Sequence, residues 1–522
     1  MNVAISPLQS LQRRSDWTLD LNLLRIHLIE GIEMRIDERI VGDEGQERFA
    51  AATGDRNPIH MDAVQARRTQ AGLPVVHGMH TLLWALETLT TEDHIVRCPT
   101  RIKVKFLKWV YLGDMAEIIL VSSVESILRF RVEVAGMSTL SAEIHFGASS
   151  ADQQIELEDI HSRSAQTPLE APRNLDLAEL EKISGNAFVA TKQDMRQMFP
   201  DLCDLVEART VAELAACSYV VGMEAPGLYS TFSKLDLEIG LTPTGGAGES
   251  LSFNVARVDE RFRKAQIHVI GSNIDGFLDT FVRTPPVEQA TMPELASRVR
   301  PEEFADMRAL IIGGSRGLGE LTAKLIGAGG GSSTITYTLG KLEAGKVIDQ
   351  IRSAGKQIEM LPYDVRKPAA SQLSLLNGPI THLFYFATNA IFRPKGEVMS
   401  SSILADFSVF YIQGFYDLCK ELVGSEKTYV SAKAPLAVYY PSSIAVEERP
   451  AGMTEYSMIK AAGEILCDDM NQHMPGLHII TTRLPRLRTD QTAGVLPERE
   501  QDPVDILLPI LRKLSSSAGV KA

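Results

Sequence analysis

Two residues near the front of the chain have the chemistry needed to move a proton at carbon with water. Asp55 and His60 lie five positions apart, on either side of Pro58, and an apolar stretch begins at Val75. A carboxylate and an imidazole held by a short rigid loop against an apolar wall can exchange protons at carbon and with water. The alternative is an Asp turn capped by Asn57, with His60 on the surface.

A second set of residues with proton-transfer chemistry lies near the C-terminus. Tyr456 and Lys460 are one helical turn apart, and Ser443 lies thirteen positions before the tyrosine. A phenol with an ordinary pKa near ~10 needs a neighbouring cation to exchange protons near neutral pH. Taken alone, a Tyr-x-x-x-Lys pattern is more often a solvated helix face.

Hydrophobic patterning predicts the elements that position Asp55 and His60. The apolar stretch leads into a helix over Met79–Leu89, and a strand meander is expected after it. The expected strands cover Thr100–Val110, Met115–Val121, Ile127–Val134 and Thr139–Phe146.

This part of the sequence resembles the MaoC-type (R)-specific enoyl-thioester hydratases and dehydratases, which have a hotdog fold. The matching residues are Phe49, Ala50, Thr53, Gly54, Asp55, Asn57, Pro58, His60, Asp62, His77 and Gly78. The resemblance implies that Asp55 and His60 are catalytic, that Asn57 holds the loop, and that Asn57, His77 and Gly78 form the substrate site. The backbone N–H of Gly78 would polarise the thioester carbonyl.

Residues 176–284 repeat the pattern of residues 1–147 faintly, after a Ser-, Gln-, Glu- and Pro-rich linker at 148–175. Ser218–Met223 is similar to Pro74–Met79, but Val221 stands where the first copy has His77. Strands are expected over Thr231–Ile239, Leu251–Val258, Lys264–Ile270 and Gly276–Val282. We interpret this stretch as a second, degenerate hotdog without the Asp-x-Asn-Pro-x-His residues. The alternative is an unrelated α+β domain.

The pattern changes after a Pro-rich linker at 285–303. An apolar run, Met307–Ile312, is followed by the glycine-rich stretch Gly313–Gly319 and by an expected helix over Glu320–Ile326. Strand, glycine-rich turn and helix in this order are typical of the first unit of a dinucleotide-binding sheet, because glycines let the backbone approach a pyrophosphate.

Residues 304–522 resemble the short-chain dehydrogenases/reductases, which have an α/β Rossmann fold with a doubly wound parallel sheet. The resemblance implies that Tyr456 is the general acid, that Lys460 lowers its pKa and holds the nicotinamide ribose, and that Ser443 hydrogen-bonds the substrate oxygen. It implies cofactor contacts from Gly313, Ser315, Arg316, Gly317, Leu318, Gly319, Thr338, Asp364, Val365, Ala387, Tyr456 and Lys460.

Three departures from this family's pattern bear on activity. Tyr385–Thr388 replaces the usual Asn-Asn-Ala-Gly and keeps only Ala387, Tyr411 stands at the catalytic asparagine, and Pro485 is followed by Arg486 instead of glycine. A modified proton relay, an altered substrate or a loss of activity could each explain these changes.

The expected cofactor is NADP(H). The second strand, Thr334–Thr338, is followed by no carboxylate before Glu343, whereas NAD users place an acidic residue there. Arg316 in the glycine-rich turn could meet a 2′-phosphate. A basic strand face (Arg101, Lys103, Lys105) and Arg67-Arg68 could contact phosphates of coenzyme A or of a carrier protein, or could simply be solvated.

Together these observations predict a double hotdog, two copies of a long helix wrapped by antiparallel sheet, followed by a Rossmann domain. The expected function is NADPH-dependent reduction of a 3-oxoacyl thioester and dehydration of the (R)-3-hydroxyacyl product, in fatty-acid or polyketide-type metabolism. The alternatives are the same pair run oxidatively, or an acyl-thioester-binding scaffold with an inactive reductase half.

Composition limits the remaining possibilities. The net charge of −13 argues against nucleic-acid binding and acidic membranes, and five scattered cysteines are typical of a reducing compartment. With no membrane span or signal peptide evident, a cytoplasmic protein is expected. We expect an acyl-CoA or acyl-carrier-protein substrate, a homodimer and no metal site.

Overall fold

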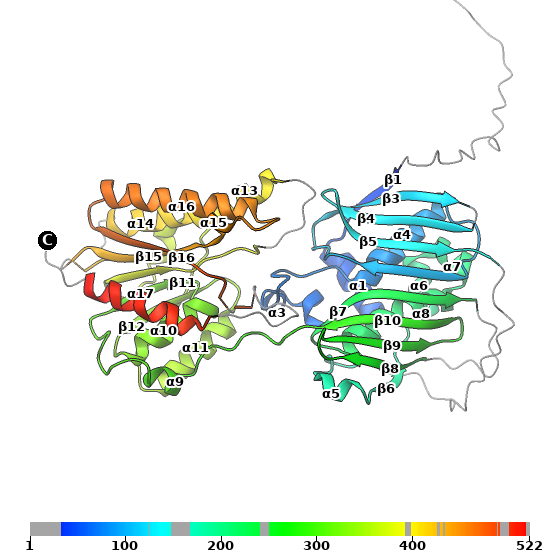
Figure 1. Ribbon diagram of the computed structural model, residues 1–522, viewed down its shortest axis with the longest axis horizontal. Coiled ribbons are helices and arrows are strands. Elements are labelled where there is room, and N and C mark those ends of the chain that lie inside the picture. Colours follow the sequence, from blue (N-terminus) through cyan, green and yellow to red (C-terminus); the bar gives the residue numbers. More distant parts are fainter. Residues whose placement is uncertain are drawn as a thin grey trace, which may run out of the picture.

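The computed structural model describes residues 33–124, 126–147, 167–240, 250–391, 398–424, 429–431, 434–487, 489–490 and 501–517. These residues form two blocks, one built on an antiparallel sheet and one on a parallel sheet (Figure 1). Most of the linker predicted at 148–175 lies outside the described residues. No described helix is both long enough and apolar enough to cross a membrane.

The first block is a ten-stranded sheet in the order β1-β3-β4-β5-β2-β7-β10-β9-β8-β6. The last five strands in this order are the mirror image of the first five. The two halves meet at β2 and β7, which pair antiparallel. The strands are β1 (Met34–Ile40), β2 (Arg101–Phe106), β3 (Met115–Val124), β4 (Ile127–Val134), β5 (Met137–His145), β6 (Ser184–Ala187), β7 (Ser230–Ile239), β8 (Leu251–Asp259), β9 (Lys264–Ile270) and β10 (Ile274–Val282).

Helices cover one face of this sheet (Figure 1). The two central ones, α4 (Gly78–Thr91) and α8 (Ala208–Tyr219), pack against each other and share one continuous apolar core with the strands. Around them lie α1 (Asp43–Thr53), α2 (Pro58–Met61), α3 (Ala63–Ala66), α5 (Leu177–Leu180), α6 (Lys192–Met198), α7 (Pro200–Val206) and the π-helical turn η2 (Val220–Glu224).

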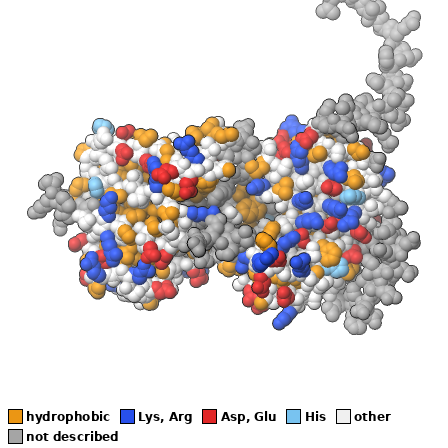
Figure 2. Space-filling model, viewed as in Figure 1, with side chains coloured by type: hydrophobic (Ala, Val, Ile, Leu, Met, Phe, Trp, Pro, Cys, Tyr) orange, Lys and Arg blue, Asp and Glu red, His pale blue; other side chains and the backbone are white. Residues whose placement is uncertain are grey.

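The opposite face of the sheet carries charged side chains of both signs (Figure 2). On β2, Ile102 and Val104 are buried while Arg101, Lys103 and Lys105 alternate with them on the other face. Arg101 Nε donates to Asp236 Oδ1 of β7 at 2.8 Å. The basic strand face is therefore partly paired with acidic residues of the neighbouring strand.

The second block is a six-stranded parallel sheet in the order β13-β12-β11-β14-β15-β16. Numbered within the block, this is the order 3-2-1-4-5-6 of a Rossmann fold, so the predicted α/β architecture is confirmed here. The strands are β11 (Arg308–Ile312), β12 (Ser332–Tyr337), β13 (Ile358–Pro362), β14 (His382–Tyr385), β15 (Leu436–Ser443) and β16 (Leu477–Leu484).

Helices on both faces bury this parallel sheet in two core clusters. They are α9 (Met292–Ala296), α10 (Gly317–Ala328), α11 (Lys341–Ser353), α12 (Ala369–Leu373), α13 (Ser401–Ser408), the π-helical turn η3 (Val409–Gln413), α14 (Gly414–Gly424), α15 (Ala445–Glu448), α16 (Thr454–His473) and α17 (Pro503–Ser517).

Part of the segment predicted as a linker at 285–303 is folded. Helix α9 begins with a capping box formed by Thr291 and Glu294, and Met292, Leu295 and Val299 are buried in the core of the Rossmann block. The Pro-rich composition suggested a linker, but apolar residues at these spacings give the segment a buried face.

Candidate active sites

Asp55 is buried at the contact between the two halves of the first block. Helix α1 ends at Gly54, whose φ of +74° favours glycine and turns the chain toward α8. Ser218 Oγ donates to Asp55 Oδ2 at 2.7 Å, and the backbone N–H of Asn57 donates to Oδ1 at 3.2 Å. Burial raises the pKa of Asp55, and the proximity of His60 and these two hydrogen bonds oppose the rise.

The second half of the sheet therefore shapes the Asp55 site. Gly222 lies in η2, directly after α8, and a Cβ added there would come within 2.8 Å of the Asp55 carboxylate. Ser218–Met223 is a weak sequence repeat of Pro74–Met79, and this repeat gives no sign of the contact with Asp55. Only the pairing of α8 with the Asp55 loop reveals it.

His60 lies on α2, next to the carboxylate. The Asn57 side chain caps α2 by accepting from Ile59 N and donates from Nδ2 to the carbonyls of Gly222 and Gly227, at 2.7 and 3.0 Å. His60 Nδ1 is 2.8 Å from the carbonyl oxygen of Val75. Since a carbonyl only accepts, Nδ1 carries the proton and Nε2 is left as a base in the neutral ring. Burial lowers the pKa of His60 to about 3.

Two of the predicted substrate-site residues lie behind the site. His77 is fully buried, its Nε2 is 3.0 Å from the Asp55 carbonyl oxygen, and its ring stacks on His60 with centroids 3.9 Å apart. Neither His77 nor Asn57 lines the cavity beside Asp55. His77 and Asn57 therefore hold the loop that carries Asp55. Of the three predicted substrate-site residues, only Gly78 lines the cavity.

Asp55, His60 and His77 also form a compact ligand-type cluster, with one atom from each within 4.8 Å of the others. This spacing is close enough for a divalent cation. The sequence-based expectation of no metal stays a prediction.

A cavity of about 80 Å³ opens beside Asp55 and His60, with walls from both halves of the sheet. Gly78, the first residue of α4, lines it, and backbone N–H groups at a helix start lack intrahelical partners. The Phe106 ring packs against Gly78, where an added Cβ would lie 2.9 Å from it, and contacts Phe232 with centroids 4.8 Å apart. Phe106 therefore forms part of the wall of this cavity, between Gly78 and Phe232.

A much larger groove, of about 570 Å³, runs along the C-terminal edge of the parallel sheet. All but one of the predicted cofactor-contacting residues line it: Gly313, Ser315, Arg316, Gly317, Leu318, Gly319, Thr338, Val365, Ala387, Tyr456 and Lys460. The exception is Asp364, whose carboxylate pairs with Arg366 at 2.8 Å and is absent from the groove wall. Its neighbours Tyr363 and Val365 line the groove instead.

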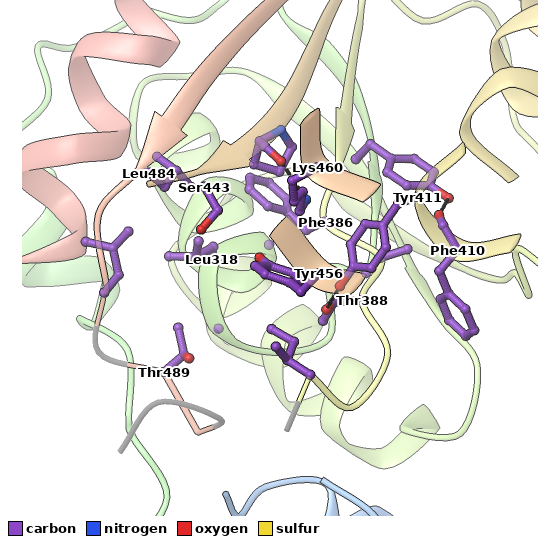
Figure 3. Close-up of a pocket in the computed structure, with 18 of the residues that line it drawn as sticks. Leu318, Phe386, Thr388, Phe410, Tyr411, Ser443, Tyr456, Lys460, Leu484 and Thr489 are labelled. Carbon is purple, nitrogen blue, oxygen red and sulfur yellow. Dashed lines mark hydrogen bonds between the residues drawn. The ribbon is translucent and has the colours of Figure 1, made fainter. Parts of the chain in front are cut away.

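Ser443, Tyr456 and Lys460 meet in this groove (Figure 3). Ser443 ends β15, and Tyr456 and Lys460 lie on consecutive turns of α16. Burial raises the pKa of Tyr456 to about 12, against a hydrogen bond with Ser443 that lowers it. Burial also lowers the pKa of Lys460 to about 7. Lys460 Nζ donates to the Pro441 carbonyl at 2.7 Å.

Tyr411 lies against these residues, at the position where the family pattern has asparagine. It belongs to η3, its hydroxyl is 2.5 Å from Thr388 Oγ1 (Figure 3), and its ring centroid is 4.4 Å from Lys460 Nζ. The Tyr440 hydroxyl donates to the Tyr411 carbonyl at 3.0 Å. Tyr440 fits there because residue 463 is glycine, where a Cβ would lie 2.3 Å from its hydroxyl oxygen.

Residues 32–142 match the family model described as "MaoC like domain". This part of the chain is therefore a MaoC-like domain, as the Asp55–His60 residues and the Gly78 helix predicted. No curated protein matches the chain.

Solved structures similar to this chain include several short-chain dehydrogenases. A putative short chain dehydrogenase from Pseudomonas syringae is 19% identical, with a TM-score of 0.37, and the match covers 45% of this chain and 96% of that one. FolM Alternative dihydrofolate reductase 1 from Brucella canis, complexed with NADP, is 16% identical, with a TM-score of 0.31 and coverage of 35% and 74%. At these values the likenesses say nothing about activity, and the Rossmann assignment rests on the strand order and glycine-rich turn.

Proposed function

We propose that this protein is a bifunctional enzyme of acyl-thioester metabolism that carries two separate proton-transfer sites. The Rossmann block reduces a 3-oxoacyl thioester to the (R)-3-hydroxyacyl thioester, and the MaoC-like domain removes water to give the trans-2-enoyl thioester. The observation that carries the proposal is the convergence of Ser443, Tyr456 and Lys460 in the groove beside the glycine-rich turn, in a chain that also has a MaoC-like domain.

In the dehydration step the C2–H and C3–O bonds break, a C2=C3 double bond forms, and water leaves. His60 Nε2 is a free base, and Asp55 is a neighbouring carboxyl with a raised pKa, so the pair can share the proton taken from C2 and the proton given to the departing hydroxyl. The Gly78 N–H at the start of α4 would stabilise negative charge on the thioester oxygen. Residues 176–284 act in this proposal as a second hotdog that holds Asp55 through Ser218 and Gly222.

The groove of the Rossmann block fits a nicotinamide dinucleotide. A Cβ on Gly317, at the start of α10, would meet no atom within 4 Å, so the backbone there is open to a pyrophosphate. The nicotinamide, when bound, supplies the hydride for the carbonyl carbon. We propose NADP(H), because Thr338 and the two residues after it carry no carboxylate.

In the reduction step Tyr456 gives its phenolic proton to the substrate oxygen, and Ser443 hydrogen-bonds the same oxygen. A phenol with a pKa raised to about 12 needs a nearby cation to lose its proton readily. Lys460, one turn along α16, would supply that charge once an anionic partner in the groove favours its protonated form. NADP(H) is the reductive pool of cells, so we propose the reductive direction.

The proposal is tested by mixing the purified protein with NADPH and an acetoacetyl thioester, as coenzyme A and as carrier-protein derivatives. We expect oxidation of NADPH and a 3-hydroxybutanoyl or crotonoyl product identified by mass.

Tight NADPH binding without any oxidation would support the alternative, a thioester-binding scaffold. Tyr411 favours that alternative, because its phenol is tied to Thr388 and its ring covers Lys460 where the family pattern has an asparagine amide.

A further inference from the structure

A short segment of the MaoC-like domain enters the groove of the Rossmann block. Arg67 and Arg68 follow α3, which lies between the two blocks in Figure 1, and Arg67 lines the groove. Arg67 forms an ion pair with Glu343, on the first turn of α11. Farther along, Gly72 lies against Ala390, where an added Cβ would be 3.1 Å from the alanine Cβ. The segment 67–72 therefore lies against the Rossmann block, with Arg67 in the groove wall.

Arg67 is at the adenosine end of the groove. A Cβ added at Gly340, three positions after the end of β12, the second strand of the Rossmann sheet, would overlap the Arg67 guanidinium. In Rossmann folds the residues at the end of this strand face the adenosine ribose and its 2′ substituent. Here that position has Thr338, Leu339 and Gly340, none of which is a cation.

Most of the cations near the end of β12 belong to the MaoC-like domain. Arg68 Nε is 3.7 Å from Glu343 and 3.5 Å from Asp490. Arg316, which the sequence offered as the 2′-phosphate contact, donates instead to the Arg67 carbonyl at 2.5 Å and lies 3.3 Å from Asp490. The guanidinium of Arg316 is thus already bonded to the Arg67 backbone and paired with Asp490, and it helps to hold Arg67 in place.

The three guanidinium groups lie close together, with Glu343 and Asp490 paired to them and Asp62 also acting on Arg67. Burial and the neighbouring Arg316 and Arg68 lower the pKa of Arg67 to about 10. Arg67 Nη2 pairs with Glu343, whereas Arg67 Nε is buried without a hydrogen-bond acceptor among the residues that the structure describes. A dianion placed here would reduce the repulsion between the guanidinium groups and accept from Nε, and guanidinium is well suited to phosphate.

We propose that Arg67 binds the 2′-phosphate of NADP(H), so that the MaoC-like domain completes the cofactor site of the Rossmann block. The inference rests on the proposed function in one respect, the use of a nicotinamide dinucleotide. When no phosphate is bound, Glu343 pairs with Arg67. If Arg67 were removed, Glu343 would be free to accept a hydrogen bond from the 2′-hydroxyl of NADH. Arg67 therefore decides between the two cofactors by neutralising Glu343.

The test is a titration of the full-length protein with NADPH and with NADH, for wild type, Arg67→Gln and Arg129→Gln. Arg129 is an exposed arginine of β4 that pairs with Glu143 on the solvent face of the sheet and serves as the matched control. We expect Arg67→Gln to raise the Kd for NADPH by roughly tenfold or more and the Kd for NADH by less than about threefold. Arg129→Gln should leave both values unchanged. Circular dichroism and thermal unfolding establish that each variant is folded.

Equal weakening of NADPH and NADH in Arg67→Gln would overturn the inference, because it would make Arg67 an interface residue only. An unchanged NADPH affinity would overturn it as well. If wild type binds neither dinucleotide, the proposed cofactor itself is wrong, which is distinct from a failure of Arg67 alone. Glu343→Gln gives a second readout: it should tighten NADPH and not NADH.

Discussion

Both proposed sites bury ionisable residues at the cost of shifting their pKa values. Asp55 and His60 are moved toward their neutral forms by burial, and Lys460 is moved in the same way to a pKa of about 7. The shifts of Asp55 and Lys460 go toward neutral pH, as is common where a group must gain and lose a proton there, whereas the shift of His60 keeps its ring neutral. The hydrogen bonds to Asp55 limit the shift, so they tune its acidity.

Removing the Ser218 hydroxyl should change the pH dependence of hydration. The Ser218 bond stabilises the ionised form of Asp55, so its loss should raise the pKa of this carboxyl. In Ser218→Ala we expect the acid-side inflection of kcat/KM for hydration of a crotonyl thioester to move to higher pH by about one unit. Ser230→Ala, at another position on the cavity wall, is the control. An inflection that stays in place would show that Asp55 is not the group reported by the profile.

Removing the buried cation of Lys460 should stabilise the protein at low pH. In the folded state without cofactor the pKa of Lys460 is about 7, below the ordinary value of ~10.4 expected in the unfolded chain. Below pH 7 both states are protonated and the burial of charge destabilises the fold; above ~10.4 both are neutral and this cost is absent. Lys460→Met should therefore have a higher Tm than wild type at pH 6.5, with the gap narrowing toward pH 10.

The same variant should lose NADPH-dependent reduction. Lys346→Met, at an exposed position of α11, gives a comparison in which any difference in Tm should not vary with pH. A Tm difference for Lys460→Met that is constant with pH would contradict the assignment of a buried, easily deprotonated lysine.

At the scale of elements, a π-helical turn lies beside each site. η2 continues α8 and places Gly222 against Asp55, whereas η3 joins α13 to α14 and places Tyr411 beside Lys460. π-helical turns are frequent at functional sites because they redirect one side chain or carbonyl out of the regular helical spacing. In η2 the redirected group is the Gly222 carbonyl, which accepts from Asn57.

Gly222→Ala should separate the two activities. The added Cβ would lie 2.4 Å from Asp55 Oδ1, so the Asp55 loop must move. A displacement of about 1 Å at a catalytic group can cost on the order of 100-fold in rate. We expect hydration of a crotonyl thioester to fall by about that factor, with NADPH-dependent reduction unchanged. Gly42→Ala, where a Cβ meets nothing within 4 Å, should affect neither activity. Full hydration in Gly222→Ala would mean that Asp55 is not held by η2.

Most regular elements could be predicted from the sequence because their periodicity is strong. The strands expected over Ile127–Val134 and Lys264–Ile270 coincide with β4 and β9, and the helix expected from Met79 is α4. Helix α9 was missed because prolines and charges around it suggested a linker. The role of His77 as a loop support depends on which way its side chain points, which spacing does not specify.

At the scale of the whole chain, one short segment joins the two sites. His60 lies on α2 beside the cavity, and Arg67, seven positions later, lies in the Rossmann groove. Sequence patterning gave no sign of this, because contacts between Arg67 and Glu343, 276 positions apart, depend on how two separately folded blocks meet. The sequence instead suggested that Arg67 contacts phosphates of coenzyme A or of a carrier protein, or is simply solvated.

The most direct test of the two-site account follows products by mass in wild type, Asp55→Asn and Tyr456→Phe, each supplied with NADPH and an acetoacetyl thioester. Wild type should form the hydroxyl and enoyl thioesters. Asp55→Asn should stop at the 3-hydroxybutanoyl thioester, and Tyr456→Phe should leave the 3-oxo substrate unreacted while still hydrating a crotonyl thioester. If either substitution abolishes both reactions in a folded protein, the two reactions do not take place at separate sites.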